Sequence, residues 1–236
     1  MHGNYCDSRA WRWQLDGLAD KFTVVAWDAP GFGASDDPPE NFDYSRCLAA
    51  FMTELGLGPA NVLGLSFGSV LALQLYRDRP ELVASLILGS AYAGWAGSLP
   101  AEVVEQRMTW TLASAGMEPA KLAAAFMPTL LADSTAPELY AEVERMVMEF
   151  HPAGVRAMTH AFGPADLRDV LPTISVPTLL IYGDRDVRSS LEVAHDIASR
   201  IPGARLAVIP GVGHLNNAEA PERFNAEVRA FMAEAR

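Results

Sequence analysis

The residues whose side chains could most clearly carry out catalysis are a serine, a histidine and two aspartates, each of which follows an apolar run. Ser66 lies in Gly-Leu-Ser-Phe-Gly (residues 64–68), between a strand-like run and a helix-like run. A serine on such a tight turn presents its hydroxyl away from the backbone, and the glycines leave room where strand and helix crowd together. The following helix aims N–H groups at the same place, which favours developing negative charge. Ser66 is a candidate nucleophile, and the alternative is a small turn residue.

A serine nucleophile needs a base, and the base needs an orienting carboxylate. His214 lies in a glycine-rich loop (residues 210–214) after the last apolar run, at the same sheet end as Ser66. The other histidines lie at the N-terminus or in helical stretches. Asp184 and Asp186 both follow the preceding apolar run, and position alone leaves both as candidates for the acid.

The elements that must position these residues form an alternating pattern. Short apolar runs of strand length occur at residues 22–27, 60–65, 85–88, 178–182 and 205–209. Runs that are apolar on both faces are typical of parallel strands covered by helices on each side. Between them lie helical patterns, such as one capped by Asp43 that ends at Gly56 and one opened by Pro221. The predicted fold class is α/β, with a mostly parallel sheet covered on both faces.

One stretch, residues 92–171, contains no convincing strand. It shows helical periodicity broken by prolines, which predicts a helical cap, the lid, over a core of residues 1–91 and 172–236. A flexible apolar lid suits a hydrophobic substrate group, although packing between lid helices is the competing interpretation. The lid has no cluster of Arg or Lys for a phosphate or dicarboxylate, so a neutral ester is the expected substrate. The candidate substrate-binding residues are Trp95, Trp110, Phe126 and Met146, with Leu215 beside the candidate base.

Composition excludes several classes of protein. The 236 residues are 50% hydrophobic, and 29 acidic against 18 basic side chains give a net charge of −11. Such a chain folds, and it lacks the basic face that nucleic acid or an anionic membrane requires. The N-terminus has no signal-peptide pattern, and no apolar run is long enough to span a membrane. The two cysteines have no metal-ligand spacing, and we expect a cytoplasmic protein without metal or cofactor.

Taken together, these motifs resemble the α/β-hydrolase superfamily, in particular its lid-bearing esterase, lactonase and carbon–carbon hydrolase branch. The matching stretches are residues 2–3, 28–35, 64–68, 183–186, 213–214 and 219–222. The order serine, aspartate, histidine is the one expected of such a triad. The resemblance implies that Asp186 is the acid, because the family places it three residues after the glycine. It also implies an oxyanion hole made by the N–H groups of Phe67 and Asn4.

The expected function is a serine hydrolase that cleaves small or medium carboxylic esters through an acyl-enzyme. Two alternatives stay open: a hydrolase of C–C bonds or enol-lactones with the same triad, and a catalytically weak homologue that binds small molecules. His2, Gly3 and Asn4 also resemble the haloalkane dehalogenases. Those enzymes, however, carry an aspartate where this chain has Ser66. The specific substrate is not predicted.

The chain departs from the family pattern at its beginning. In similar proteins the His-Gly pair, here His2 and Gly3, ends a third strand that lies between the strands equivalent to residues 22–27 and 60–65. Loss of a central strand leaves rows of backbone groups unpaired. We therefore consider that the flanking strands pair directly, that a second copy supplies or covers the strand, or that the chain is a truncated form or starts at a misplaced codon.

Overall fold

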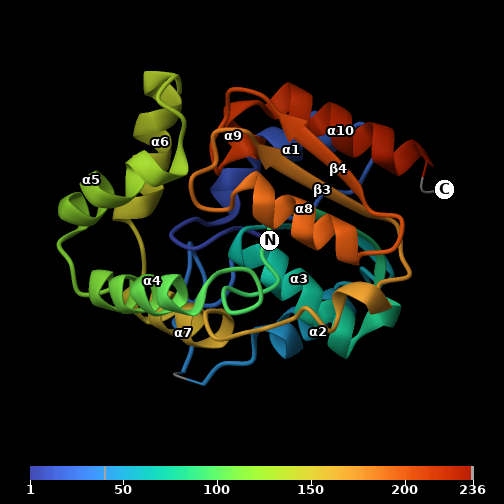
Figure 1. Ribbon diagram of the computed structural model, residues 1–236, viewed down its shortest axis with the longest axis horizontal. Coiled ribbons are helices and arrows are strands. Elements are labelled where there is room, and N and C mark those ends of the chain that lie inside the picture. The colour runs from blue at the N-terminus through green and yellow to red at the C-terminus, as the bar shows by residue number, and fades with distance from the viewer. Residues whose placement is uncertain (40, 235–236) are drawn as a thin grey trace.

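The computed structural model describes residues 1–39 and 41–234. Its sheet has four parallel strands in the order β1-β2-β3-β4, which is also their order along the chain. The strands are β1 (Ala60–Leu65), β2 (Val83–Gly89), β3 (Thr178–Gly183) and β4 (Arg205–Ile209). Four of the five predicted strands are thus present. Helices flank this sheet on both faces (Figure 1), which confirms the α/β fold class.

Helices connect and cover the strands. The α-helices of the core are α1 (Arg12–Leu18), α2 (Tyr44–Glu54), α3 (Phe67–Asp78), α8 (Leu191–Arg200), α9 (Asn216–Glu219) and α10 (Pro221–Glu234). Short 3-10 helices occur at Ser8–Trp11, Pro80–Leu82 and Leu171–Thr173. Helix α2 begins at its predicted cap, where the carboxylate of Asp43 accepts a hydrogen bond from the Arg46 N–H at 2.9 Å. It ends just before Gly56, whose positive φ of 64° suits glycine.

Four further helices lie between β2 and β3: α4 (Ala101–Ser114), α5 (Pro119–Leu130), α6 (Pro137–Met148) and α7 (Pro152–Phe162). No strand interrupts them in this part of the described chain. Each helix has a proline at or just before its first position, where the missing N–H costs no hydrogen bond. In Figure 1, α4, α5 and α6 stand to one side of the core. The division into two domains stays a prediction.

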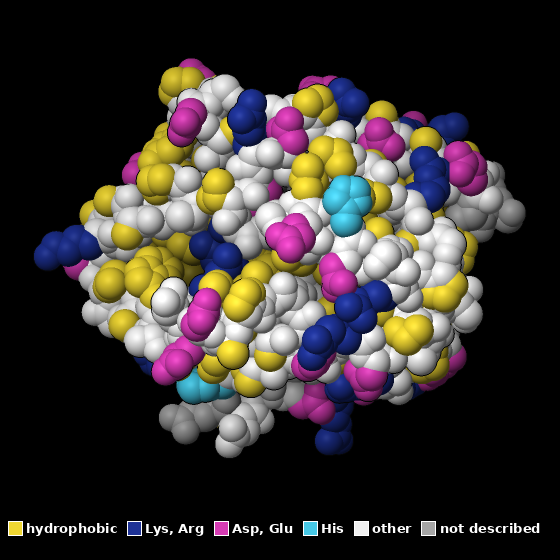
Figure 2. Space-filling model, viewed as in Figure 1, with side chains coloured by type: hydrophobic (Ala, Val, Ile, Leu, Met, Phe, Trp, Pro, Cys, Tyr) yellow, Lys and Arg dark blue, Asp and Glu magenta, His cyan; other side chains and the backbone are white. Residues whose placement is uncertain are grey.

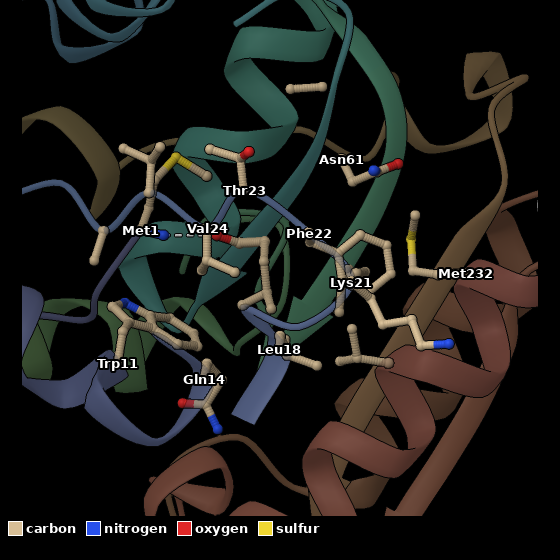
Figure 3. A pocket seen from close by; sticks show the side chains of 16 residues that line it. Met1, Trp11, Gln14, Leu18, Lys21, Phe22, Thr23, Val24, Asn61 and Met232 are labelled. Atoms are coloured by element: carbon tan, nitrogen blue, oxygen red, sulfur yellow. Dashed lines mark hydrogen bonds between the residues drawn. The ribbon is translucent and has the colours of Figure 1, made fainter. Parts of the chain in front are cut away.

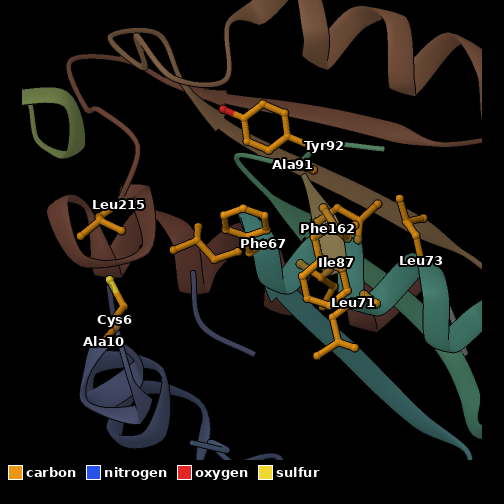
Figure 4. Close-up of a cluster of buried hydrophobic side chains, with 14 of the residues drawn as sticks. Cys6, Ala10, Phe67, Leu71, Leu73, Ile87, Ala91, Tyr92, Phe162 and Leu215 are labelled. Atoms are coloured by element: carbon orange, nitrogen blue, oxygen red, sulfur yellow. The ribbon is translucent and has the colours of Figure 1, made fainter. Parts of the chain in front are cut away.

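The core lies between the sheet and α3. Every residue of β3 is buried, and so are most residues of α3. Phe67 and Leu71 of α3 meet Ile87 of β2 and Phe162 of α7 in one cluster (Figure 4). Burial of this apolar surface fixes the strand–turn–helix unit that carries Ser66. Within the described residues, none of the helices combines the length and hydropathy needed to cross a bilayer.

The prediction of a strand at residues 22–27 is wrong. This segment forms no ladder with a neighbour, and among the described residues the N–H groups of residues 23–27 have no backbone partner. A strand needs a partner for those groups, and none of the strands in the described chain lies beside residues 22–27. Val25 accordingly keeps 44% of its surface exposed.

A gap takes the place of the missing neighbour. Cavities of about 410 and 150 Å³ lie between residues 22–27 and β1, one bordered by α1 and α10 and the other by α2. Figure 3 shows Phe22, Val24, Trp11 and Met232 around the larger one. The flanking segments therefore do not close up into a direct pair.

Met1 alone occupies the end of this gap. Its amino group donates to the Leu63 carbonyl at 2.6 Å, and its own carbonyl accepts from the Leu65 N–H at 3.0 Å. This is the pattern of one residue of a parallel strand on the outer edge of β1. The following His2 is buried, and its Nε2 accepts from the Ala29 N–H at 3.1 Å. The N-terminal segment is thereby fixed beside the end of β1 that leads to Ser66.

Candidate active site

Ser66 occupies a strained turn between β1 and α3. Its φ of 55° and ψ of −116° lie outside the conformations that non-glycine residues usually adopt. The turn is tight on both sides. A Cβ on Gly64 would lie 2.2 Å from the Gly68 carbonyl oxygen, and one on Gly68 would lie 2.3 Å from the Met1 carbonyl oxygen. Both glycines are therefore required by close backbone approach, as the motif predicts.

His214 and Asp186 form a buried pair. The Nδ1 of His214 lies 2.8 Å from Asp186 Oδ2, and the other carboxylate oxygen accepts the backbone N–H groups of Arg188 and Ser189 at 2.8 and 2.9 Å. Burial favours the neutral acid, but the histidine ring and these hydrogen bonds outweigh it and hold the pKa of Asp186 below its usual value. Because Asp186 is ionised, His214 Nδ1 carries the proton and Nε2 is free to accept one.

The structure distinguishes the two candidate acids that position alone left open. Asp184 is exposed, and its Oδ1 accepts the Gly211 N–H at 2.6 Å, so it shapes the loop that leads to His214. Asp186 alone contacts the His214 ring. The resemblance had selected the same residue.

Ser66 and His214 line one small cavity, whose volume is about 10 Å³. No hydrogen bond joins the Ser66 hydroxyl to the imidazole in this part of the described structure. Ser66 is only 8% exposed, so a substrate reaches it only after side chains or the lid move. The cavity also brings together these sequence-predicted residues: Asn4, Phe67, Phe126 and Leu215.

The two predicted oxyanion-hole residues both border the cavity. Phe67 is the first residue of α3, so its N–H belongs to the four that lack an acceptor inside the helix. Asn4 precedes Tyr5, whose positive φ of 59° turns the backbone beside Ser66. The Asn4 side chain is engaged as an acceptor for the Tyr5 N–H at 3.1 Å. Among the described residues, neither of these two backbone N–H groups donates to a backbone carbonyl, and their role as an oxyanion hole stays a prediction.

Three of the predicted substrate-binding residues do not line the cavity. Trp95 is buried against Phe67 with ring centroids 4.9 Å apart, Trp110 stacks on Phe126 at 5.7 Å, and Met146 packs inside the lid. They support the residues that face the cavity. Their placement is the packing that the competing interpretation of the lid describes, and their part in substrate binding stays a prediction.

Four cavity residues were not predicted: Gly3, Cys6, Leu130 and Arg188. A Cβ on Gly3 would lie 3.2 Å from the Ser66 Cβ, so this glycine keeps the nucleophile accessible. Arg188 had a usable signal, because it follows Asp186 by two residues in the same loop. Leu130 and Cys6 are ordinary apolar residues in sequence, and only the tertiary structure brings them here.

The lid is tied to the loop that carries His214. The Leu130 carbonyl accepts the N–H groups of His214 and Leu215 at 2.9 and 3.2 Å. The half-buried carboxylate of Glu219 accepts the Gly213 N–H on one oxygen, and the Ala132 N–H and Thr135 hydroxyl on the other, each at 2.9 Å. The end of α5 and the histidine loop are thus held as one unit.

Comparison with known proteins agrees with this geometry. A model of the alpha/beta hydrolase family matches residues 1–227. The chain is similar to 3-oxoadipate enol-lactonase 2 of Acinetobacter baylyi, at 27% identity over 94% of this chain and 83% of the relative. It is similar to the pimeloyl-[acyl-carrier protein] methyl ester esterase of Nitrosomonas europaea, at 27% identity over 95% of this chain and 90% of the relative.

Among solved structures, a thermophilic esterase from Thermogutta terrifontis superposes with a TM-score of 0.91 and 30% identity, over 99% of this chain and 88% of that chain. A family match over almost the whole chain, from Met1 past His214, and this superposition identify the fold independently. The chain therefore belongs to the alpha/beta hydrolase family.

Proposed function

We propose that this protein is a serine hydrolase that cleaves carboxylic esters through an acyl-enzyme, with Ser66 as nucleophile, His214 as base and Asp186 as orienting acid. Relatives named as esterases and lactonases support hydrolysis as the reaction class. The single observation that carries the specific mechanism is the placement of Ser66, in a strained turn, on the cavity that the buried His214–Asp186 pair borders.

In the first half of the reaction, Ser66 Oγ attacks the ester carbonyl carbon as its proton passes to His214 Nε2. The ionised Asp186 holds the ring by Nδ1–H and stabilises the imidazolium that forms. The carbonyl oxygen becomes an oxyanion, which the N–H groups of Phe67 and Asn4 stabilise. Collapse of the tetrahedral intermediate breaks the ester C–O bond, and His214 returns the proton to the leaving alcohol.

In the second half, water attacks the acyl-enzyme as His214 Nε2 removes its proton. The new tetrahedral intermediate expels Ser66 Oγ, which regains its proton from His214, and the carboxylic acid leaves. The cycle consumes one water and needs no other reactant.

Turnover of a series of p-nitrophenyl esters, together with labelling by a fluorophosphonate probe, tests this proposal. We expect turnover of short and medium acyl chains and a probe adduct that mass spectrometry maps to Ser66. Ser66→Ala loses both. The proposal is overturned if the folded wild type hydrolyses no ester and Ser66 stays unlabelled.

A second candidate is hydrolysis of a lactone. The similarity to an enol-lactonase over 94% of the chain favours it. A lactone is a cyclic ester, so the same attack by Ser66 opens the ring and leaves alcohol and acyl group on one molecule. Comparing kcat/KM for open esters with that for lactones of equal carbon number separates the two candidates.

A further inference from the structure

The active-site cavity contains an arginine that the proposed mechanism does not use. Arg188 lies in the loop between β3 and α8, and its backbone N–H donates to Asp186. Its side chain borders the same cavity as Ser66 and His214. Figure 2 shows basic and hydrophobic side chains together in the recess between the lid helices and the core.

Protein groups accept few of the hydrogen bonds that the Arg188 guanidinium can donate. Its Nη1 donates to the Thr129 hydroxyl at 3.0 Å, and its Cζ lies over the Phe126 ring, 4.6 Å from the ring centre. A guanidinium carries five N–H donors. Across residues 1–39 and 41–234, this is its only side-chain hydrogen bond, and no carboxylate lies within 4.0 Å of it.

The neighbouring polar groups are already engaged. Both oxygens of Asp186 accept hydrogen bonds from His214 and from loop N–H groups. The Tyr92 hydroxyl accepts from Arg107, and the Tyr5 hydroxyl is bonded to Ser114. Asp186 attracts the charge of Arg188 from a distance, but in the described chain none of these groups accepts a hydrogen bond from the guanidinium.

A second arginine, Arg107, adds to the positive charge beside the cavity. Arg107 donates to the Arg188 carbonyl at 2.9 Å and to Tyr92, and within the described chain it too lacks an acidic partner. Desolvation and this like charge hold the pKa of Arg188 below its usual value. The protein has 29 acidic and 18 basic side chains, yet in the described chain these two neighbouring, half-buried arginines have no carboxylate within 4.0 Å of either.

A half-buried charge has lost part of its contact with water, and an ionic partner compensates for that loss. A planar carboxylate accepts two parallel N–H groups from a guanidinium and supplies the missing charge. Aromatic support from Phe126 leaves the edge of the guanidinium for such a contact. A substrate whose acyl group is at Ser66 can place a second group there, since both residues border one small cavity.

We propose that Arg188 binds a carboxylate on the substrate, and that the preferred substrates are therefore anionic esters or lactones such as half-esters of short dicarboxylic acids. The inference rests on the proposed function and narrows it, since the lid sequence alone indicates a neutral ester. Arg188 is the specificity-determining residue, and Arg107 positions its backbone.

Pairs of substrates that differ only in the charge of one end group test whether the enzyme prefers a carboxylate there. The monomethyl esters of succinate, glutarate and adipate are compared with the corresponding monoamide methyl esters, which have the same shape and no charge. We expect wild-type kcat/KM, measured by methanol release, to favour the carboxylate at the best chain length by about tenfold or more. In Arg188→Gln we expect that ratio to fall by about 10–100-fold, because a charge-assisted contact is lost.

Two variants control for indirect effects. Arg188→Lys keeps the charge without the planar fork and should retain part of the preference. Arg185→Gln removes a charge from the same loop, where the side chain is 72% exposed, and should leave the wild-type ratio intact. Thermal melting checks that each variant is folded.

The outcomes separate this inference from the proposed function. A wild-type ratio near one, or a ratio that survives in Arg188→Gln, overturns the inference even if esters are hydrolysed. If wild type hydrolyses neither series nor any p-nitrophenyl ester, and Ser66 stays unlabelled, the proposed function fails. Calorimetric measurement of glutarate binding to wild type and Arg188→Gln then tests the inference by itself. Binding by wild type that Arg188→Gln loses supports the carboxylate site, and equal binding by both refutes it.

Discussion

At the scale of single residues, the candidate site depends on contacts that conservative substitutions can test. Asp186 and Asp184 are two residues apart, yet only Asp186 contacts His214. Asp186→Asn keeps the shape of the side chain, but its amide can donate to His214 Nδ1 and so favours the tautomer with the proton on Nε2. We therefore expect kcat to fall by about 10³–10⁴-fold. Asp184→Asn retains an acceptor for the Gly211 N–H and should keep near-normal activity. Equal losses in both variants would contradict the assignment of the acid.

Gly3 gives a second test at this scale. An alanine there would place its Cβ 3.2 Å from the Ser66 Cβ and 3.8 Å from its Oγ. We expect Gly3→Ala to lower kcat/KM by about tenfold or more, because a shift of the nucleophile costs at least about 1.4 kcal/mol of transition-state stabilisation. Gly116→Ala is the control, since the nearest atom to a Cβ there is 3.7 Å away. Unchanged activity of folded Gly3→Ala would show that Ser66 has more room than its surroundings indicate.

At the scale of elements, the lid and the histidine loop share the Glu219 carboxylate. Glu219→Ala leaves the N–H groups of Gly213 and Ala132 without their acceptor, at about 1–3 kcal/mol for each group that stays buried. We therefore expect Tm to fall by several degrees and kcat to decrease as His214 loses its support. Glu222→Ala, on the exposed start of α10, is the control. A Glu219→Ala variant with normal Tm and kcat would show that the lid and loop are held together by other contacts.

Hydrogen exchange distinguishes paired from unpaired strands. Residues 23–27 have no backbone partners for their N–H groups in the described chain, whereas residues 86–88 of β2 pair on both sides. We expect fast exchange at the first segment and strong protection at the second. Protection of residues 23–27 would mean that something pairs with them. The hypothesis that a second copy supplies or covers the missing strand would then be tested by the molecular mass from light scattering.

How far sequence predicts these elements depends on whether the signal is local. Asp43, Gly56 and Pro221 mark helix ends by local chemistry, and the helices begin and end there. The prediction of a strand at residues 22–27 fails because an apolar run indicates burial between two neighbours. In the described chain, cavities lie between this segment and β1 in place of one neighbour. In the site, Ser66 and His214 lie in short motifs that can be recognised in the sequence. Leu130 has no such motif, and only the folded position of α5 places it at the cavity.

At the scale of the whole molecule, one lid and one sheet end enclose a cavity of about 10 Å³. The apolar surface of α3 fixes Ser66, the β3 and β4 loops fix Asp186 and His214, and α5 covers them. Because the carboxyl ends of parallel strands meet at one edge, residues more than a hundred positions apart converge there. Because Ser66 is only 8% exposed, side chains or the lid must move before a substrate enters the site.

The pH dependence of stability belongs to this scale, because it reflects what the folded chain buries. His2 is buried, and desolvation lowers its pKa from 6.5 to about 4, even though its Nδ1 lies 2.9 Å from the Gly3 carbonyl. In the unfolded chain His2 gains a proton near pH 6.5, and in the folded chain only near pH 4. The contribution of His2 to stability is therefore complete above about pH 6.5 and falls as the pH drops towards 4, by on the order of 3 kcal/mol.

Denaturant unfolding at fixed temperature between pH 4 and 8 measures this effect, with His2→Gln as the comparison. The variant loses one buried histidine, so the stability gap between wild type and variant should narrow steadily from pH 6.5 to 4 and stay constant above pH 7. A constant gap across the whole range would place the His2 ring in contact with water. Because His2 also holds the segment that carries Gly3 and Asn4 beside Ser66, acid should lower activity and stability in the same pH interval.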